Sequence, residues 1–156
     1  MAGRHQDLLQ RQDGVMKGMN VTGARPAALS ERITECHFDR IDPDISVEHF
    51  AHTGEFADAL AMLAVTQDDL GGSDMTTAEI EAAIDRRGYR RATGSELLDY
   101  VRAKWNGKDT VAALDSCVEQ YVLYVYGGPD RRALSLRWVR PHRHWGGHVR
   151  FLVVPK

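Results

Sequence analysis

The strongest constraint on the fold of this chain is a change in sequence pattern at Thr110. From there to the C-terminus, short segments rich in β-branched and aromatic residues alternate with turn residues, a pattern typical of strands. Leu134, Leu136 and Trp138 alternate with polar residues, as expected for an antiparallel strand with one face in water. We expect four strands, over residues 110–117, 120–126, 132–139 and 148–154, with a hairpin loop at 127–130.

The residues before Thr110 have the periodicity and the start signals of helices. Thr93 is followed three residues later by Glu96, which is the spacing of a capping box. Thr76 or Thr77 supplies similar helix-start chemistry before an apolar stripe. We expect helices over residues 27–38, 46–65, 76–87 and 94–105. The predicted fold class is α+β: a helical N-terminal half, then an antiparallel sheet of about four strands packed on the last two helices.

The chain divides into three parts by composition. Residues 1–26 contain few apolar residues and recurrent glycines, so we expect a mobile arm there. The paired glycines at 71 and 72 favour a turn and mark an internal boundary. The predicted organisation is therefore a mobile arm over 1–26, an acidic helical region over 27–70 and a basic α+β domain over 74–156.

Charge is distributed unevenly along the chain, although the net charge is only −2. Residues 1–85 carry 6 Lys and Arg against 16 Asp and Glu, whereas residues 86–156 carry 14 against 6. One interpretation is that the halves neutralise each other, or that a second copy does so in a homo-oligomer. Another is that the basic half contacts nucleic acid or another polyanion. A third is that the acidic half binds a protein partner.

Several features predict a cytoplasmic protein that does not engage a membrane. No apolar run approaches the roughly 20 residues that a membrane-spanning helix needs. The first residues lack the apolar segment of a secretory signal. Cys36 and Cys117 are too few for a disulfide framework or a four-thiolate zinc site, so both are predicted to be reduced thiols.

Arginines and tryptophans of the basic half are the candidate binding residues. Arginine forms paired hydrogen bonds with phosphate or carboxylate, and tryptophan offers a stacking surface. The predicted binding residues are Arg90, Arg91, Arg137, Trp138, Arg143 and Trp145. The alternative is that these segments are a solvated helix end and a solvated loop between strands, since cations are also favoured at helix C-termini.

Three histidines within seven residues, His142, His144 and His148, are the candidate metal ligands, because imidazole is the commonest metal-binding side chain. The nearby arginines and the absence of an adjacent carboxylate disfavour a cation there. The sequence has no nucleophile elbow, phosphate-binding glycine loop or zinc-protease motif. We therefore expect a non-enzymatic binding protein with no cofactor and no catalytic residue, with an enzyme or metal-binding protein using the histidines as the alternative.

The segment 88–97, which reads GYRRATGSEL, resembles the GYRLPT-x-x-E-[WL] opening of bacterial C-type-lectin-like domains, including the formylglycine-generating-enzyme superfamily. It is also similar to small bacterial α+β proteins that share a GYR-x-AT-x-x-ELL helix start. Arg91 and Ala92 replace the usual Leu-Pro, and no paired copper-binding cysteines are present. The resemblance implies a compact α+β scaffold whose strand-connecting loops bind a ligand, and it assigns no catalytic residue.

Overall fold

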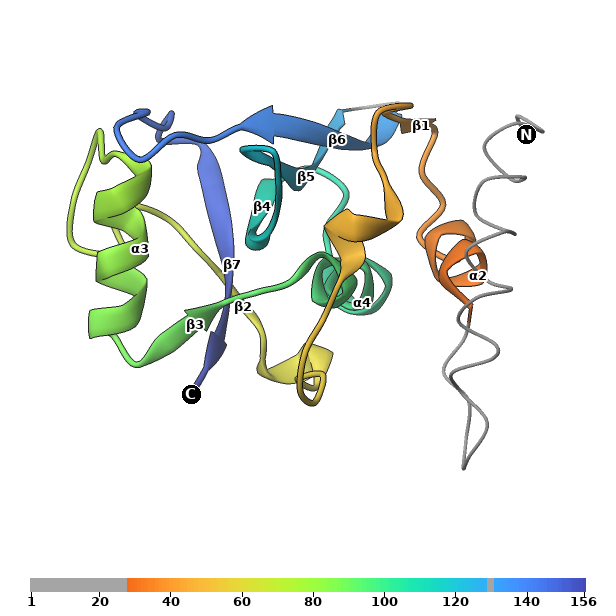
Figure 1. The fold of residues 1–156 in the computed structure, drawn as a ribbon, viewed down its shortest axis with the longest axis horizontal. Helices are drawn as coiled ribbons and strands as arrows, with labels where there is room; N and C mark the ends of the chain where they lie inside the picture. Colours follow the sequence, from red (N-terminus) through yellow and green to blue (C-terminus); the bar gives the residue numbers. More distant parts are fainter. Residues whose placement is uncertain (1–27, 129–130) are drawn as a thin grey trace.

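A seven-stranded mixed β-sheet organises the computed structural model, which describes residues 28–128 and 131–156 (Figure 1). Along the sheet, the strand order is β1 (Arg40–Ile41), β6 (Arg131–Trp138), β5 (Tyr121–Gly128), β4 (Thr110–Val118), β7 (Val149–Pro155) and β2 (Leu63–Val65), and β3 (Tyr89–Arg91) also pairs with β7. The predicted mobile arm lies outside the described residues, as do two residues of the predicted hairpin loop.

The predicted fold class is wrong in two respects. The four expected strands are present as β4 to β7, but the residues before Thr110 contribute three more, β1, β2 and β3. The sheet is also mixed, because β7 runs parallel to β4 and β1 runs parallel to β6. After the β4–β5–β6 meander, residues 139–148 cross the sheet and place β7 on the free side of β4. A pattern of apolar residues does not encode that crossing.

The helix predicted over residues 46–65 is wrong. This segment contains two short 3-10 helices, η1 (Val47–Phe50) and η2 (Ala59–Ala61), followed by β2. Gly54 has a φ of 86°, which interrupts a right-handed helix. Phe56 and Leu60 are 47% and 76% exposed, so their helical spacing does not correspond to a buried face. The helix predicted over 27–38 is shortened to α2 (Leu29–Thr34).

The two helices predicted from capping boxes are confirmed as α3 (Thr77–Arg86) and α4 (Gly94–Lys104). The Glu79 amide donates to the Thr76 hydroxyl at 3.2 Å, and the Glu96 amide donates to the Thr93 hydroxyl at 3.2 Å. The backbone of each helix start is therefore satisfied locally, and the sequence signal is correspondingly strong.

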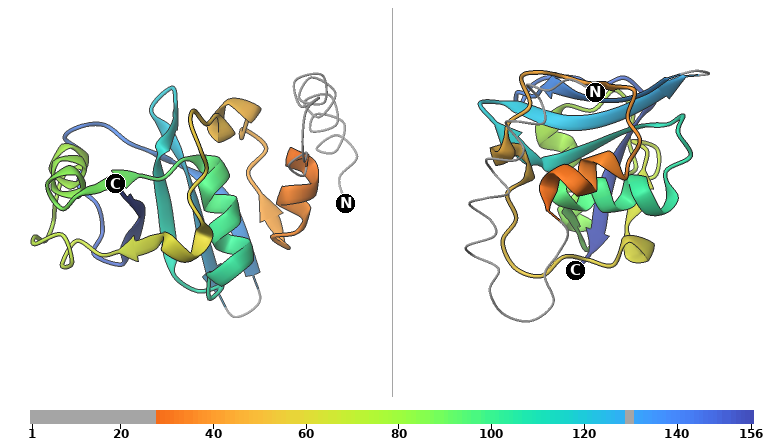
Figure 2. Two further views of the ribbon diagram at one scale, coloured as in Figure 1. Left: turned by 90° about the horizontal axis from the view of Figure 1, so that it is seen from below. Right: turned by 90° about the vertical axis from the view of Figure 1, so that its right-hand side faces the viewer.

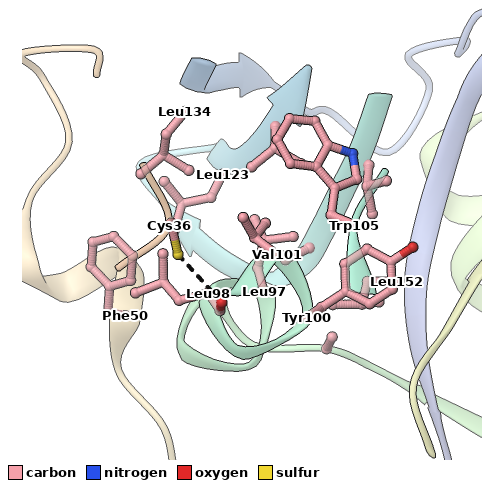
Figure 3. Close-up of a cluster of buried hydrophobic side chains, with 14 of the residues drawn as sticks. Cys36, Phe50, Leu97, Leu98, Tyr100, Val101, Trp105, Leu123, Leu134 and Leu152 are labelled. Carbon is pink, nitrogen blue, oxygen red and sulfur yellow. Dashed lines mark hydrogen bonds between the residues drawn. The ribbon is translucent and has the colours of Figure 1, made fainter. Parts of the chain in front are cut away.

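One face of the sheet packs against α4 and α2, and this packing forms the larger core cluster. Leu97, Leu98 and Val101 of α4 lie against Leu123 and Leu134 of the sheet (Figure 3). The Cys36 thiol is fully buried and donates to the Leu98 carbonyl at 3.4 Å. Burial raises the pKa of this thiol to about 12, so it stays protonated and acts as a core residue.

The other face of the sheet packs against α3, which lies on the opposite side from α4 (Figure 2, left). Ile80 and Ile84 of α3 are fully buried with Phe151 of β7 and Trp145 of the preceding loop. The cluster lies mainly over β4 and β7. On the β5 and β6 part of this face, several side chains stay partly exposed, namely those of Tyr124, Tyr126, Ser135 and Arg137.

The acidic and basic halves of the described chain pack on each other. Leu29, Phe50 and Met62 share one core cluster with Leu97 and Leu152. Ion pairs also join the halves: Glu35 with Arg102, Glu81 with Arg91, and Asp85 with Lys156. Part of the charge asymmetry is therefore neutralised within the molecule. Among residues 28–128 and 131–156, no helix has the length and apolar character that crossing a membrane requires.

Candidate functional site

Arg90 of β3 is bound to a carboxylate. Its guanidinium donates twice to Glu96, at 2.9 Å and 2.7 Å, and the Glu96 carboxylate also accepts from the Ala57 amide at 2.9 Å and the Thr93 amide at 3.1 Å. Glu96 is fully buried. Burial alone would raise its pKa, but these hydrogen bonds outweigh the burial and lower the pKa to about 2. Arg90 therefore neutralises the buried Glu96 carboxylate, whose hydrogen bonds join the loop at Ala57, strand β3 and the start of α4.

Arg91, the next residue, also pairs with an acid, since it donates to Glu81 at 3.0 Å. Both side chains line a pocket of about 470 Å³ between α3 and β3. The same pocket contains Asp85 and Lys156, which form an ion pair with each other. The charges in this pocket are largely balanced, so neither Arg90 nor Arg91 offers an unpaired cation to a ligand.

Trp145 is buried, with 2% of its surface exposed. Its indole nitrogen donates to the Thr77 hydroxyl at 2.8 Å, and its ring packs edge-on against Phe151 at 5.2 Å. It anchors residues 139–148 on the first turn of α3, and a ligand in solvent cannot stack on it. The residues next to Trp145 in the sequence are polar or glycine, so nothing in the sequence indicated that its side chain is buried.

Arg137 and Trp138 are consecutive on β6 and therefore face opposite sides of the sheet. Trp138 is 42% exposed, stacks on Tyr121 at 6.3 Å and lies under the guanidinium of Arg140 at 4.2 Å. Arg137 points to the face of α3, where its guanidinium lies 5.2 Å from the Trp145 ring and 6.0 Å from the Tyr124 ring. The predicted binding residues therefore do not form one surface.

Two tyrosines that the sequence analysis missed extend the surface around Arg137. Tyr124 and Tyr126 of β5 stack on each other with ring centroids 5.5 Å apart. Tyr124 lies opposite Ser135 in the β5–β6 register. Trp145, Arg137, Tyr124 and Tyr126 thus form one stacked series across the sheet. The alternation of Val122, Tyr124 and Tyr126 is the sequence signal that could have revealed it.

Unpaired arginines accompany the stacked series. In the described ranges, no ion pair involves Arg137 or Arg143. The Nε atoms of Arg137 and Arg143 are buried and have no hydrogen-bond partner. The backbone of Arg143 lies at the Trp145 end of the series, because Thr77, whose hydroxyl accepts from the Trp145 indole, donates its amide to the Arg143 carbonyl at 2.9 Å. We call Tyr124, Tyr126, Ser135, Arg137 and Arg143 the basic aromatic face.

The other face of the sheet is acidic near Tyr121, at the start of β5. A pocket of about 480 Å³ is lined there by Asp42, Asp44, Glu48 and Glu119, beside the partly exposed Tyr121. None of these four carboxylates has a cationic partner in the part of the chain that the structure describes. The two sides of the β5–β6 end therefore differ in charge, and only one of them suits an anion.

The three histidines do not converge. His144 faces Asp74, with its Nδ1 atom 2.7 Å from the Asp74 carbonyl, while His142 and His148 are exposed. No group of three histidine, cysteine, aspartate or glutamate side chains within residues 28–128 and 131–156 is arranged to hold a metal ion.

Comparisons with known proteins give no match for this chain, whether with family models, curated proteins or solved structures. The resemblance of segment 88–97 to lectin-like domains stays a prediction. The geometry of the basic aromatic face therefore carries the functional argument alone.

Proposed function

We propose that this chain is a non-enzymatic binding protein that holds a polyanion on the basic aromatic face. The observation that carries the proposal is the contrast among its arginines. Elsewhere in the fold, five arginines are paired with carboxylates, namely Arg32, Arg90, Arg91, Arg102 and Arg150. Arg137, on the basic aromatic face, lies against two aromatic rings and has no carboxylate partner in the described ranges.

Stacking leaves an arginine ready to bind an anion. A ring that contacts the flat side of a guanidinium leaves the N–H groups, which lie in the plane of that group, available for phosphate or carboxylate oxygens. The contacts of Arg137 with two rings also fix its position before a ligand arrives, which reduces the entropy lost on binding.

Charge on the rest of the molecule favours one orientation of the partner. The acidic pocket beside Tyr121 repels a polyanion, whereas the unpaired arginines attract it. The attraction depends on neutralised phosphates and released counterions, so it weakens as salt increases. The same arginines would also bind other polyanions of similar charge density.

The test is fluorescence anisotropy of a labelled single-stranded oligonucleotide with the full chain at about 50 and 200 mM salt. The informative variant changes Arg137 and Arg143 to glutamine. The matched control changes Arg86 and Arg87 to glutamine and so removes the same charge elsewhere. We expect the first variant to lose at least about tenfold in affinity and about two units of salt slope.

Two outcomes would refute the proposal. One is an absence of binding by the full chain at the lower salt concentration. The other is an equal loss of affinity in the control, which would mean that only net charge matters. Circular dichroism of both variants checks that each is folded.

A further inference from the structure

The stacked series ends at a pocket. Tyr126, the last ring of the series, lines a hollow of about 340 Å³ together with Ala133 and Ser135 of β6. Arg40, Asp42 and Pro43, from β1 and the residues after it, form the other wall. Asp42 lies at the edge of the sheet and also lines the acidic pocket beside Tyr121. The volume falls in the range typical of small-ligand pockets. This hollow therefore continues the basic aromatic face at the β1 edge of the sheet.

We infer that this pocket binds a nucleobase that carries a phosphate, and the inference rests on the proposed polyanion-binding function. Trp145, Arg137, Tyr124 and Tyr126 follow one another at 5.2, 6.0 and 5.5 Å, so each lies within cation–π or stacking distance of the next. Tyr126 has no further ring neighbour within the described ranges. A flat heterocycle in the pocket continues the stack, and every nucleobase offers such a face.

The polar groups of the pocket fit a base better than a phosphate. The Asp42 carboxylate repels a phosphate placed inside the pocket but accepts hydrogen bonds from the N–H groups at a base edge. Its Oδ1 atom already accepts from the Asp44 amide at 2.9 Å, which fixes the orientation of the carboxylate. Ser135 adds a hydroxyl that can donate or accept.

The cations lie where the phosphate of such a ligand would be. Arg40 is exposed beside the pocket and has no ion pair in the described part of the chain. Arg137 lies two stacked groups away along the series. Arg40 would thus lie beside a base bound on Tyr126, near the phosphate of the same nucleotide, whereas Arg137 lies further along the series, toward the phosphate of a neighbouring nucleotide in a single strand.

The test compares a single-stranded DNA oligonucleotide with an abasic oligonucleotide of the same length and charge, both bound to the full chain at low salt. The informative variant is Tyr126→Leu, and the matched control is Tyr121→Leu, on the same strand but the opposite face. We expect the base-bearing strand to bind at least about tenfold more tightly than the abasic strand. Tyr126→Leu should remove this difference, whereas Tyr121→Leu should preserve it.

Tyr126→Phe keeps the ring, so it should keep the preference for bases, and this variant protects the test against a fold defect in Tyr126→Leu. Equal binding of the two strands by the unaltered chain overturns the inference while leaving polyanion binding intact. Binding of neither strand overturns both. A mononucleotide that competes with the base-bearing strand identifies a free nucleotide as a sufficient ligand, whereas binding that only the strand shows identifies a nucleic acid.

Discussion

Arg90 and Arg137 have the same side chain in opposite surroundings. Arg90 donates twice to a fully buried carboxylate and joins β3 to α4. Arg137 lies between two aromatic rings, and its Nε atom has no hydrogen-bond partner. The first arrangement stabilises this fold, whereas the second leaves donors for a ligand. A count of basic residues along the chain does not distinguish these roles.

The difference predicts separate consequences for stability and for binding. Loss of one partner of a buried ion pair leaves an uncompensated charge, which is strongly destabilising. Loss of a stacked, partly exposed arginine removes only a modest cation–π contribution. Substitutions in the two regions should therefore affect different measurements.

The largest expected effect is that of Glu96→Ala. This substitution leaves the Arg90 guanidinium and the amides of Ala57 and Thr93 without their acceptor. We expect the free energy of unfolding to fall by about 3–5 kcal/mol, measured by urea denaturation. A loss below about 1 kcal/mol would mean that the buried pair does not hold these segments together.

Acid should weaken the fold through the same carboxylate. Its pKa is about 2 in the folded state, against an ordinary value of 4.5 in the unfolded chain, so the unfolded chain takes up the proton first as pH falls. The stabilisation is complete above about pH 4.5 and is lost between 4.5 and 2, by about 3 kcal/mol in total. Urea denaturation at several pH values measures this loss.

Glu96→Gln is the control for the acid experiment. The amide cannot titrate, so this variant should show a smaller loss of stability over the same pH interval, although it is less stable at neutral pH. If its pH dependence equals that of the unaltered chain, another carboxyl group is responsible.

The smallest expected effect is that of Glu81→Ala. Glu81 pairs with Arg91, but their side chains are 39% and 43% exposed. Exposed pairs of this kind contribute between about 0 and 1 kcal/mol, because water screens both charges. A loss near that of Glu96→Ala in urea denaturation would contradict the distinction between the buried and the exposed pairs.

Local signals in the sequence predicted the elements that depend on local contacts. The capping boxes at Thr76 and Thr93 correctly located α3 and α4, because each cap is completed within three residues. The four C-terminal strands also followed from their composition. The parallel pairing of β7 with β4 was missed, since residues 149–151 find Thr110–Ala112 only through a long crossing loop.

The candidate site was predicted less well, because its geometry depends on strand register. The sequence grouped Arg137 with Trp138, which point to opposite faces, and treated Trp145 as exposed although it is buried. The stacking of Tyr124 on Tyr126 and of Arg137 on Tyr124 needs the β5–β6 pairing to be known. The alternation of residues along β5 could place the two tyrosines on one face. It could not show that Trp145 lies against Arg137 on that same face.

The most direct test of the account measures unfolding free energy and oligonucleotide affinity for Arg90→Gln and Arg137→Gln in parallel. Arg90→Gln should lower the stability by several kcal/mol while the folded protein keeps its affinity. Arg137→Gln should lower the affinity several-fold and change stability by no more than about 1 kcal/mol. The opposite pattern, with Arg137→Gln unfolding the protein and leaving its affinity unchanged, would contradict the assignment of Arg90 to the fold and Arg137 to the ligand.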